Sequence, residues 1–182
     1  MKDPSEQILK KLLKNFKSGR YDEAEKLALS ITQEFPKHQF SWKVLGLLFG
    51  LTNRFNDSVL SCEKAVELNP KDAEAYNNLS VSLNELGKFK EAIVNSMKAI
   101  TIKPDYAEAY YNMGIAFQEL GKLSEAEFNF KRAIDLKKGF SKAISSLGMV
   151  LLRKGKHKEG ISMLRIGDGS IFFDTDNGVT IQ

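Results

Sequence analysis

Apolar and small side chains recur at helical spacing over Ala73–Pro104, in two runs with a short interruption between them. The first run consists of Tyr76, Leu79, Ser80 and Leu83, and the second of Ala92, Ser96, Ala99 and Ile100. This spacing predicts two amphipathic helices. Gly87 lies between the runs and suits the left-handed conformation that ends a helix, and Pro104 stops the second helix. We therefore predict a pair of antiparallel helices with small residues where the two approach.

The same pattern returns with a period of 34 residues. The segment that begins at Ala107 matches the segment that begins at Ala73 position by position, without a gap. Pro36, Pro70 and Pro104 have the same separation. A single pair of short helices cannot bury its apolar face, so a strict period of this length predicts a stack of helix pairs, a helical solenoid.

The outer pairs follow the pattern less closely. We expect Asp3 to cap the first helix, with Pro4 at its first helical position. Lysines surround the apolar face of this helix, which would also suit a membrane surface, but the turn that follows favours a degenerate first repeat. Asn53 replaces the turn glycine of the second pair, and Asn is the best substitute in a left-handed conformation. Gly139 is expected to end a helix where Lys138 replaces the proline.

The helical pattern ends near Gly167. Ile171–Thr175 and Val179–Gln182 are rich in β-forming residues, and the Asp-Asn-Gly sequence between them is a hairpin turn signal. We expect residues 167–182 to form a non-helical, hairpin-like tail. It either caps the last helix pair or begins a domain outside this chain. The second interpretation is favoured, because Phe172 and Phe173 would point to opposite faces of a strand.

Composition restricts the classes of function. The chain has 182 residues, of which 42% are apolar and 27% charged, as in a soluble globular domain. It contains no apolar run long enough for a membrane span and no secretory signal pattern, and it has one cysteine, so we predict a cytoplasmic location. Residues 137–165 carry eight Lys or Arg and one Glu, but no aromatic platform accompanies them, so nucleic-acid binding is not expected.

The repeat resembles the tetratricopeptide repeat (TPR). Its pattern of an aromatic residue, Leu-Gly, a bulky residue, Gly, Ala, an aromatic residue, Ala and Pro is matched closely in the third and fourth pairs. The chain is similar to bacterial TPR arrays of the O-linked N-acetylglucosamine transferase-like type. The resemblance implies an all-α, right-handed superhelical α-solenoid of about five helix-turn-helix units. The expected solenoid covers residues 1–166, with repeats at 5–38, 39–72, 73–106, 107–140 and 141–166.

In the TPR fold the first helices of successive repeats line a concave groove, and this implies the binding residues. Asn78 and Asn112 share one repeat position, and an amide there can grip a peptide main chain, although Asn is also common at this position without that role. The carboxylate clamp of chaperone-binding relatives is broken, because Leu47 and Glu108 stand at two of its positions. The expected groove residues are Lys43, Leu47, Asn77, Asn78, Val81, Glu85, Tyr111, Asn112, Ile115, Gln118, Glu119, Ser145 and Met149.

Candidates for catalysis or metal binding are few. His38 lies in a linker and His157 at a turn, without a nearby nucleophile or metal-ligand spacing. Asp174–Gly178 resembles a calcium loop only faintly, because the third ligand and the closing Glu are missing. Cys62 is expected to be a buried apolar side chain rather than a reactive thiol. We therefore predict no enzyme activity, no metal and no cofactor.

The predicted function is that of a non-catalytic scaffold or adaptor, which binds a peptide segment or a partner protein in the concave groove. The alternative is a targeting or substrate-recruiting TPR part of a modular enzyme. The catalytic domain, a glycosyltransferase, sulfotransferase, methyltransferase or oxygenase, would then lie outside this chain.

Overall fold

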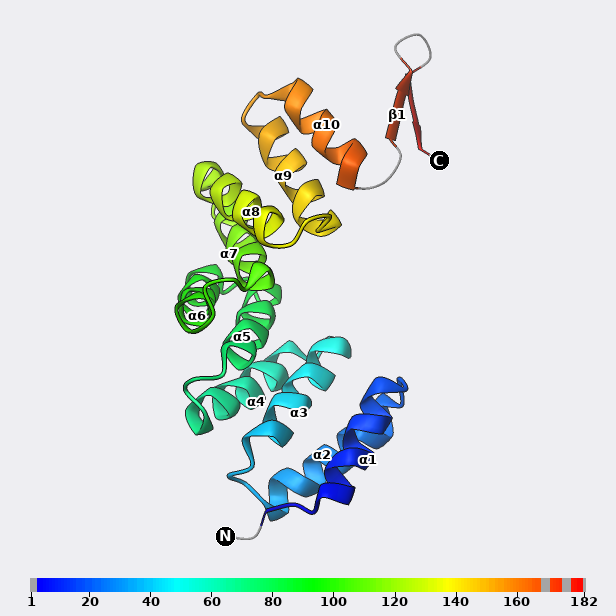
Figure 1. Ribbon diagram of the computed structural model, residues 1–182, viewed down its shortest axis with the longest axis vertical. Helices are drawn as coiled ribbons and strands as arrows, with labels where there is room; N and C mark the ends of the chain where they lie inside the picture. Colours follow the sequence, from blue (N-terminus) through cyan, green and yellow to red (C-terminus); the bar gives the residue numbers. More distant parts are fainter. Residues whose placement is uncertain (1–2, 168–170, 175–177, 182) are drawn as a thin grey trace. The chain divides into compact units, whose positions relative to one another are not determined.

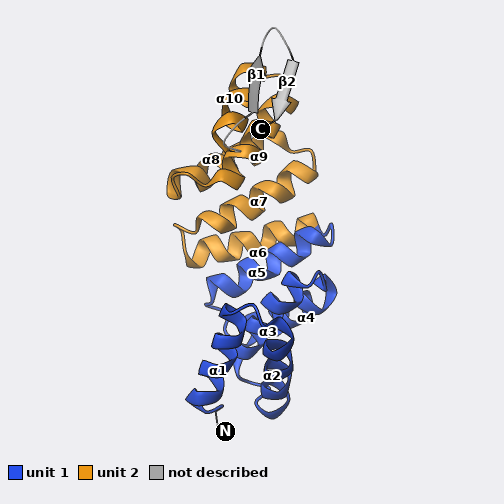
Figure 2. Ribbon diagram, turned by 90° about the vertical axis from the view of Figure 1, so that its right-hand side faces the viewer, with its two compact units in different colours: residues 1–88 blue, residues 89–182 orange. Residues whose placement is uncertain are grey.

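The computed structural model describes residues 3–167, 171–174 and 178–181. Within these ranges the chain forms ten α-helices and two short strands (Figure 1). The helices divide into two compact units, residues 1–88 and residues 89–182 (Figure 2). The helices predicted from the 34-residue period are confirmed, and each unit is described by itself below.

Unit 1 contains five helices that pack in chain order, each against the next, and α3 also contacts α5. They are α1 (Glu6–Lys17), α2 (Tyr21–Glu34), α3 (Gln39–Leu51), α4 (Phe55–Leu68) and α5 (Ala73–Glu85). The first three helices share a core that excludes water. This core consists of Leu12, Ala24, Ala28, Ile31, Val44, Leu45, Leu48 and Phe49. Contact between alternate helices is what a solenoid requires, because a lone pair leaves one face uncovered.

Unit 2 repeats the arrangement with five more helices, again packed in chain order, and α7 also contacts α9. They are α6 (Phe89–Ile102), α7 (Ala107–Glu119), α8 (Leu123–Leu136), α9 (Ser141–Arg153) and α10 (His157–Gly167). Its core is centred on Phe130, which is fully buried, with Ala126, Leu147, Val150 and Leu151.

Small residues set the distance between the two helices of a pair. A Cβ atom on Gly46 of α3 would lie 2.5 Å from the Sγ atom of Cys62 on α4. In the later repeats, Gly114 meets Phe130 in the same way, and a Cβ on Gly148 would lie 2.9 Å from the main-chain oxygen of Gly160. These glycines let the helix axes approach closely.

One expectation for helix ends is confirmed, one is wrong, and one stays a prediction. Asn53 has a φ of 58°, so it adopts the predicted left-handed conformation. Gly139 has a φ of 73°, but α8 already ends at Leu136, so the role of Gly139 in ending the helix stays a prediction. Ser5, rather than Asp3, caps α1: its backbone is extended, and its hydroxyl accepts a hydrogen bond from the amide of Ile8 at 3.4 Å. Pro4 therefore precedes the cap instead of occupying the first turn.

Two four-residue strands follow α10 in the sequence. β1 (Ile171–Asp174) pairs with β2 (Gly178–Ile181) in antiparallel register, with Ile171 opposite Ile181. Residues 175–177, where the turn is predicted, lie outside the described residues. The role of the tail, as a cap or as the start of another domain, stays a prediction.

Candidate functional site

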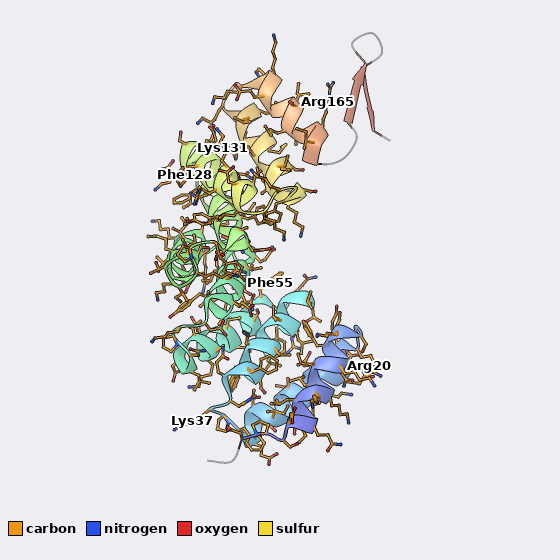
Figure 3. The ribbon with its side chains drawn as sticks, viewed as in Figure 1. Arg20, Lys37, Phe55, Phe128, Lys131 and Arg165 are labelled. Carbon is orange, nitrogen blue, oxygen red and sulfur yellow. The ribbon has the colours of Figure 1, made fainter. Side chains whose placement is uncertain are left out.

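A pocket of about 330 Å³ lies in unit 1, with walls from α3, α5 and the start of α4. Four of the predicted groove residues line it: Leu47 comes from α3, and Asn78, Val81 and Glu85 come from α5. The structure thus brings together residues that are more than 30 positions apart in the sequence. Figure 3 labels Phe55, which contributes to the wall where α4 begins.

The pocket is open beside Gly50 of α3. A Cβ on Gly50 would meet only the Ser58 hydroxyl at 3.6 Å, so no side chain fills this space. Ser58 Oγ donates to the main-chain oxygen of Gly46 at 2.7 Å and lies 2.6 Å from Ser82 Oγ. These polar groups satisfy one another, and Leu51, with 54% of its surface exposed, presents an apolar wall. The pocket therefore suits an apolar side chain.

Lys43, another predicted groove residue, connects α3 to α5. Its Nζ atom lies 2.9 Å from Asp72 Oδ2 and 3.0 Å from Glu74 Oε2. Asp72 also accepts from Gln39 Nε2 at 2.8 Å, and its other oxygen caps α5 by accepting from the amide of Ala75 at 3.1 Å. The charge of Lys43 is therefore already engaged within the protein.

The pKa values of the pair agree with this geometry. Burial opposes ionisation of Asp72, but hydrogen bonds from Lys43, from the Ala75 amide and from Gln39 outweigh it and hold the pKa below its usual value. Burial likewise lowers the pKa of Lys43, and hydrogen bonds to Asp72 and Glu74 more than compensate, so the net shift is upward. Both groups are charged at neutral pH.

The two neighbouring asparagines of α5 differ in their surroundings. Asn78 is half-buried and lines the pocket, whereas Asn77 is buried. Of these two amides, Asn78 is therefore the one that a peptide bound in the pocket could reach. The predicted contact of Asn77 with a ligand stays a prediction.

In unit 2 the predicted groove residues lie on α7 and α9. Tyr111 and Ile115 pack against the core around Phe130, and Asn112 is buried. Gln118 joins the two helices, because its main-chain oxygen accepts a hydrogen bond from Arg153 Nη1 at 3.3 Å. The remaining residues are more accessible: Ser145 is half-buried, and Glu119 and Met149 are exposed.

Two of the residues considered for catalysis, Cys62 and His38, are buried or hydrogen-bonded within the fold, and His157 is exposed at the start of α10. Cys62 is fully buried, as predicted, and burial raises the pKa of its thiol to about 12. His38 Nδ1 lies 2.8 Å from Ser41 Oγ, and burial lowers the pKa of its imidazole. No group of three or more His, Cys, Asp or Glu side chains is placed to hold a metal within the described ranges. The calcium-like segment Asp174–Gly178 falls partly outside those ranges.

Sequence reasoning missed part of the pocket and one charged cluster. Gly50 lines the pocket on α3, and a glycine at this helical position is a sequence signal that could have indicated the open space. In unit 2, Glu127 is buried and lies 2.7 Å from the Nζ atoms of both Lys131 and Lys154. Hydrogen bonds from Lys131 and then Lys154 lower the pKa of Glu127 to about 2. The sequence separation of Glu127 and Lys154 hides this contact.

None of the helices in the described part of the chain is long and apolar enough to cross a membrane.

Comparison with known proteins identifies the repeat. Family models described as TPR repeat or tetratricopeptide repeat match residues 61–94, 81–121 and 107–140. A comparison with curated proteins gives no significant match.

Solved structures similar to this chain include MamA, which is 26% identical, with 86% of this chain and 91% of that chain covered and a TM-score of 0.76. TTC0263, a thermophilic TPR protein in Thermus thermophilus, is 20% identical, with 93% of each chain covered and a TM-score of 0.74. YrrB, a TPR protein with an unusual peptide-binding site, is 15% identical, with 91% and 86% covered and a TM-score of 0.72. The helix pairs of residues 61–140 are therefore tetratricopeptide repeats, and the likeness of fold extends over most of the chain.

Proposed function

We propose that this chain is a non-catalytic scaffold that binds a peptide segment of a partner protein. The pocket of unit 1 carries the proposal, because it combines an apolar wall with the half-buried amide of Asn78 and the exposed carboxylate of Glu85. Leu51 and Val81 would contact an apolar side chain of the peptide, and Asn78 would bond to its main chain. Glu85 would favour a basic residue beside that anchor.

Two further observations support this function. YrrB, which shares the fold, is described as having a peptide-binding site. On the TPR pattern, the first helix of a repeat supplies binding residues, and α3 and α5 are such helices. The exposed residues Glu119 and Met149 are proposed as a second contact surface in unit 2. The right-handed superhelix, the repeat boundaries and the cytoplasmic location belong to the same proposal.

The alternative, a recruiting part of a larger enzyme, is not favoured. The similar solved structures are described as TPR proteins or as MamA, and this chain covers 86–93% of each of the three named above.

In the test, short peptides that bind the full chain are selected from a displayed library. The affinity of a selected peptide is then measured by fluorescence polarisation. Gly50→Met would fill the pocket, and Asn78→Ala would remove its amide, so each should weaken binding by about tenfold or more, the equivalent of about 1.4 kcal/mol. Asn56→Ala is the matched control, since Asn56 is exposed on α4 and is not among the residues that line the pocket.

The expected pattern is loss of affinity in Gly50→Met and Asn78→Ala, with Asn56→Ala and the circular dichroism of all three unchanged. Failure to select any peptide, or equal affinity of all variants, would remove the pocket as the binding site.

A further inference from the structure

A second hollow, of about 480 Å³, lies at the other side of unit 1, between α1 and α2. Three of its seven lining residues are basic and one is acidic: they are Lys11, Asn15, Arg20, Glu23, Lys26, Leu27 and Ser30. Arg20, labelled in Figure 3, stands at the turn between the two helices. None of these residues belongs to the peptide pocket.

Asn15 is out of pattern at its place in the repeat. The amide of Arg20 donates to the Asn15 main-chain oxygen at 3.0 Å, as the amide of Arg54 does to Phe49 at 2.8 Å. Asn15 therefore occupies the position that Phe49 occupies in the next repeat. The residues at this position in the four later repeats are all apolar: Phe49, Leu83, Phe117 and Leu151. Lys11 is likewise polar at a position that is apolar in the later repeats, where the equivalent residues are Leu45, Leu79, Met113 and Leu147.

Asn15 exposes 7% of its surface, and its side chain forms no hydrogen bond with any residue that the structure describes. Its amide is not among the described side-chain atoms that are closed off from solvent without a partner, so it keeps a small accessible edge. Asn15 lines the hollow, so a ligand bound there can reach this amide.

The charges around Asn15 define the ligand. Lys11, Arg20 and Lys26 stand against the single carboxylate of Glu23, and no ion pair joins any of the three cations to the described part of the chain. Arg54, the counterpart of Arg20 in the next repeat, is instead paired with Glu25 at 2.6 Å. The hollow thus carries excess positive charge, and Arg20 offers a planar fork that matches a carboxylate.

A neighbouring hollow of about 410 Å³ extends this surface along α1. It is lined by Lys10, Lys11 and Lys14, among others, and shares Lys11 with the first. Two basic hollows joined at one residue suit an extended chain with several carboxylates rather than a single small anion. We infer that the hollow between α1 and α2 binds an acidic peptide segment, with one carboxylate held by Asn15, Lys11 and Arg20.

The experiment uses the full chain and a fluorescein-labelled hexaglutamate peptide, with hexaserine as the uncharged probe. Asn15→Leu places the residue of the equivalent position Leu83 in the hollow, and Lys11→Ala with Lys26→Ala removes two of its cations. Each should weaken hexaglutamate binding by about tenfold or more. Asn15→Leu should also melt at the same or a higher temperature, because the four later repeats carry an apolar residue at this largely buried position.

The matched control removes two exposed lysines of unit 2, Lys142→Ala with Lys158→Ala, and so changes the net charge by the same amount. This control should bind hexaglutamate within about twofold of the unaltered chain. An equal loss in both double variants would mean diffuse attraction by surface charge and would overturn the site. Unchanged binding by Asn15→Leu would do the same.

Two further measurements distinguish the acidic peptide from other anionic ligands. Competition by inorganic phosphate at millimolar concentration, sensitive to Asn15→Leu, would replace the acidic peptide by a phosphate ligand. Binding to vesicles of anionic lipid that depends on Lys11 and Lys26, without binding of hexaglutamate, would replace it by a membrane surface. Displacement by unlabelled hexaglutamate alone is the result expected here.

Discussion

A Cβ atom on Gly114 would lie 2.7 Å from Cε1 of Phe130, closer than two carbon atoms can approach. The Phe130 ring is fully buried, so it has little room to move away. Gly114→Ala should therefore lower the free energy of unfolding by about 1–2 kcal/mol, the cost of overpacking less the better helix propensity of Ala. Urea unfolding measures this change.

Gly50→Ala is the control for that prediction. Its new Cβ would meet Ser58 Oγ at an ordinary 3.6 Å, so the same chemical change should raise stability by up to about 1 kcal/mol. Gly114→Ala in a Phe130→Leu background should cost less than in the unaltered chain, because Leu can rotate away. Equal effects of Gly114→Ala and Gly50→Ala would contradict the close approach of α7 and α8.

The Glu127 cluster predicts a dependence of stability on pH. The pKa of Glu127 is lowered from 4.5 to about 2, so its ion pairs contribute fully above pH 4.5 and are lost as the pH falls through about 2. Glu127→Gln should cost about 1–2 kcal/mol at pH 7, a value reduced by solvent screening because the Lys131 side chain is 54% exposed. The difference in the free energy of unfolding between Glu127→Gln and the unaltered chain should become smaller as the pH falls from 4.5 to 2.

Glu125→Gln provides the comparison for Glu127. Glu125 is exposed two residues away on the same helix, and its carboxylate forms no ion pair within the described ranges. The free energy of unfolding of Glu125→Gln in urea should equal that of the unaltered chain at every pH measured. A loss in Glu127→Gln that stays constant down to pH 2 would rule out the ion pairs as its cause.

Asp72 serves two functions, and two substitutions separate them. Asp72→Asn keeps an oxygen to cap α5 but loses the ion pair with Lys43, so it should cost less than about 1 kcal/mol. Asp72→Ala loses both and should cost about 1–3 kcal/mol. Thermal and urea unfolding give the two values.

A cycle with Lys43→Met checks the ion pair itself. If Lys43 and Asp72 interact, the double variant Lys43→Met with Asp72→Asn should lose less stability than the sum of the single losses. Strict additivity would show that the 2.9 Å contact between them contributes nothing.

Cys62 should be inert in the folded protein. Its thiol is fully buried, and burial raises its pKa to about 12, so almost no thiolate forms at neutral pH. We expect reaction with Ellman's reagent only when guanidinium chloride unfolds the chain. Rapid labelling of the native protein at pH 8 would mean that α3 and α4 separate readily.

The helices could be predicted because the repeat displays the same local signals several times. Asn53 illustrates this: only its position, four residues after Phe49 and in the place of Gly87, indicates a left-handed backbone, and its φ of 58° agrees. The prediction of the residue that caps α1 was wrong for the opposite reason. The first repeat follows the repeat pattern less closely, and Asp3 and Ser5 were both suitable capping residues.

The sites were less predictable, because they depend on contacts that repeat spacing does not encode. The ion pair of Lys43 with Asp72, the residue that caps α5, could not be predicted from the repeat, and the contact of Lys43 with a ligand stays a prediction. Asn15 went unnoticed beside the apolar Phe16, although the residue equivalent to Asn15 in every later repeat is apolar. Comparison of each position across the repeats is the signal that would have found it.

The close pairs of small and large residues limit how this chain can change by recombination. Gly46 faces a cysteine on α4, whereas Gly114 faces a phenylalanine on α8. Exchanging α4 for α8 alone would bring an aromatic ring into a space shaped for a thiol, and the reverse exchange would leave a void. Crossovers that preserve packing therefore fall in the loops between pairs, such as the one at Pro70, so that the two helices of a pair are inherited together.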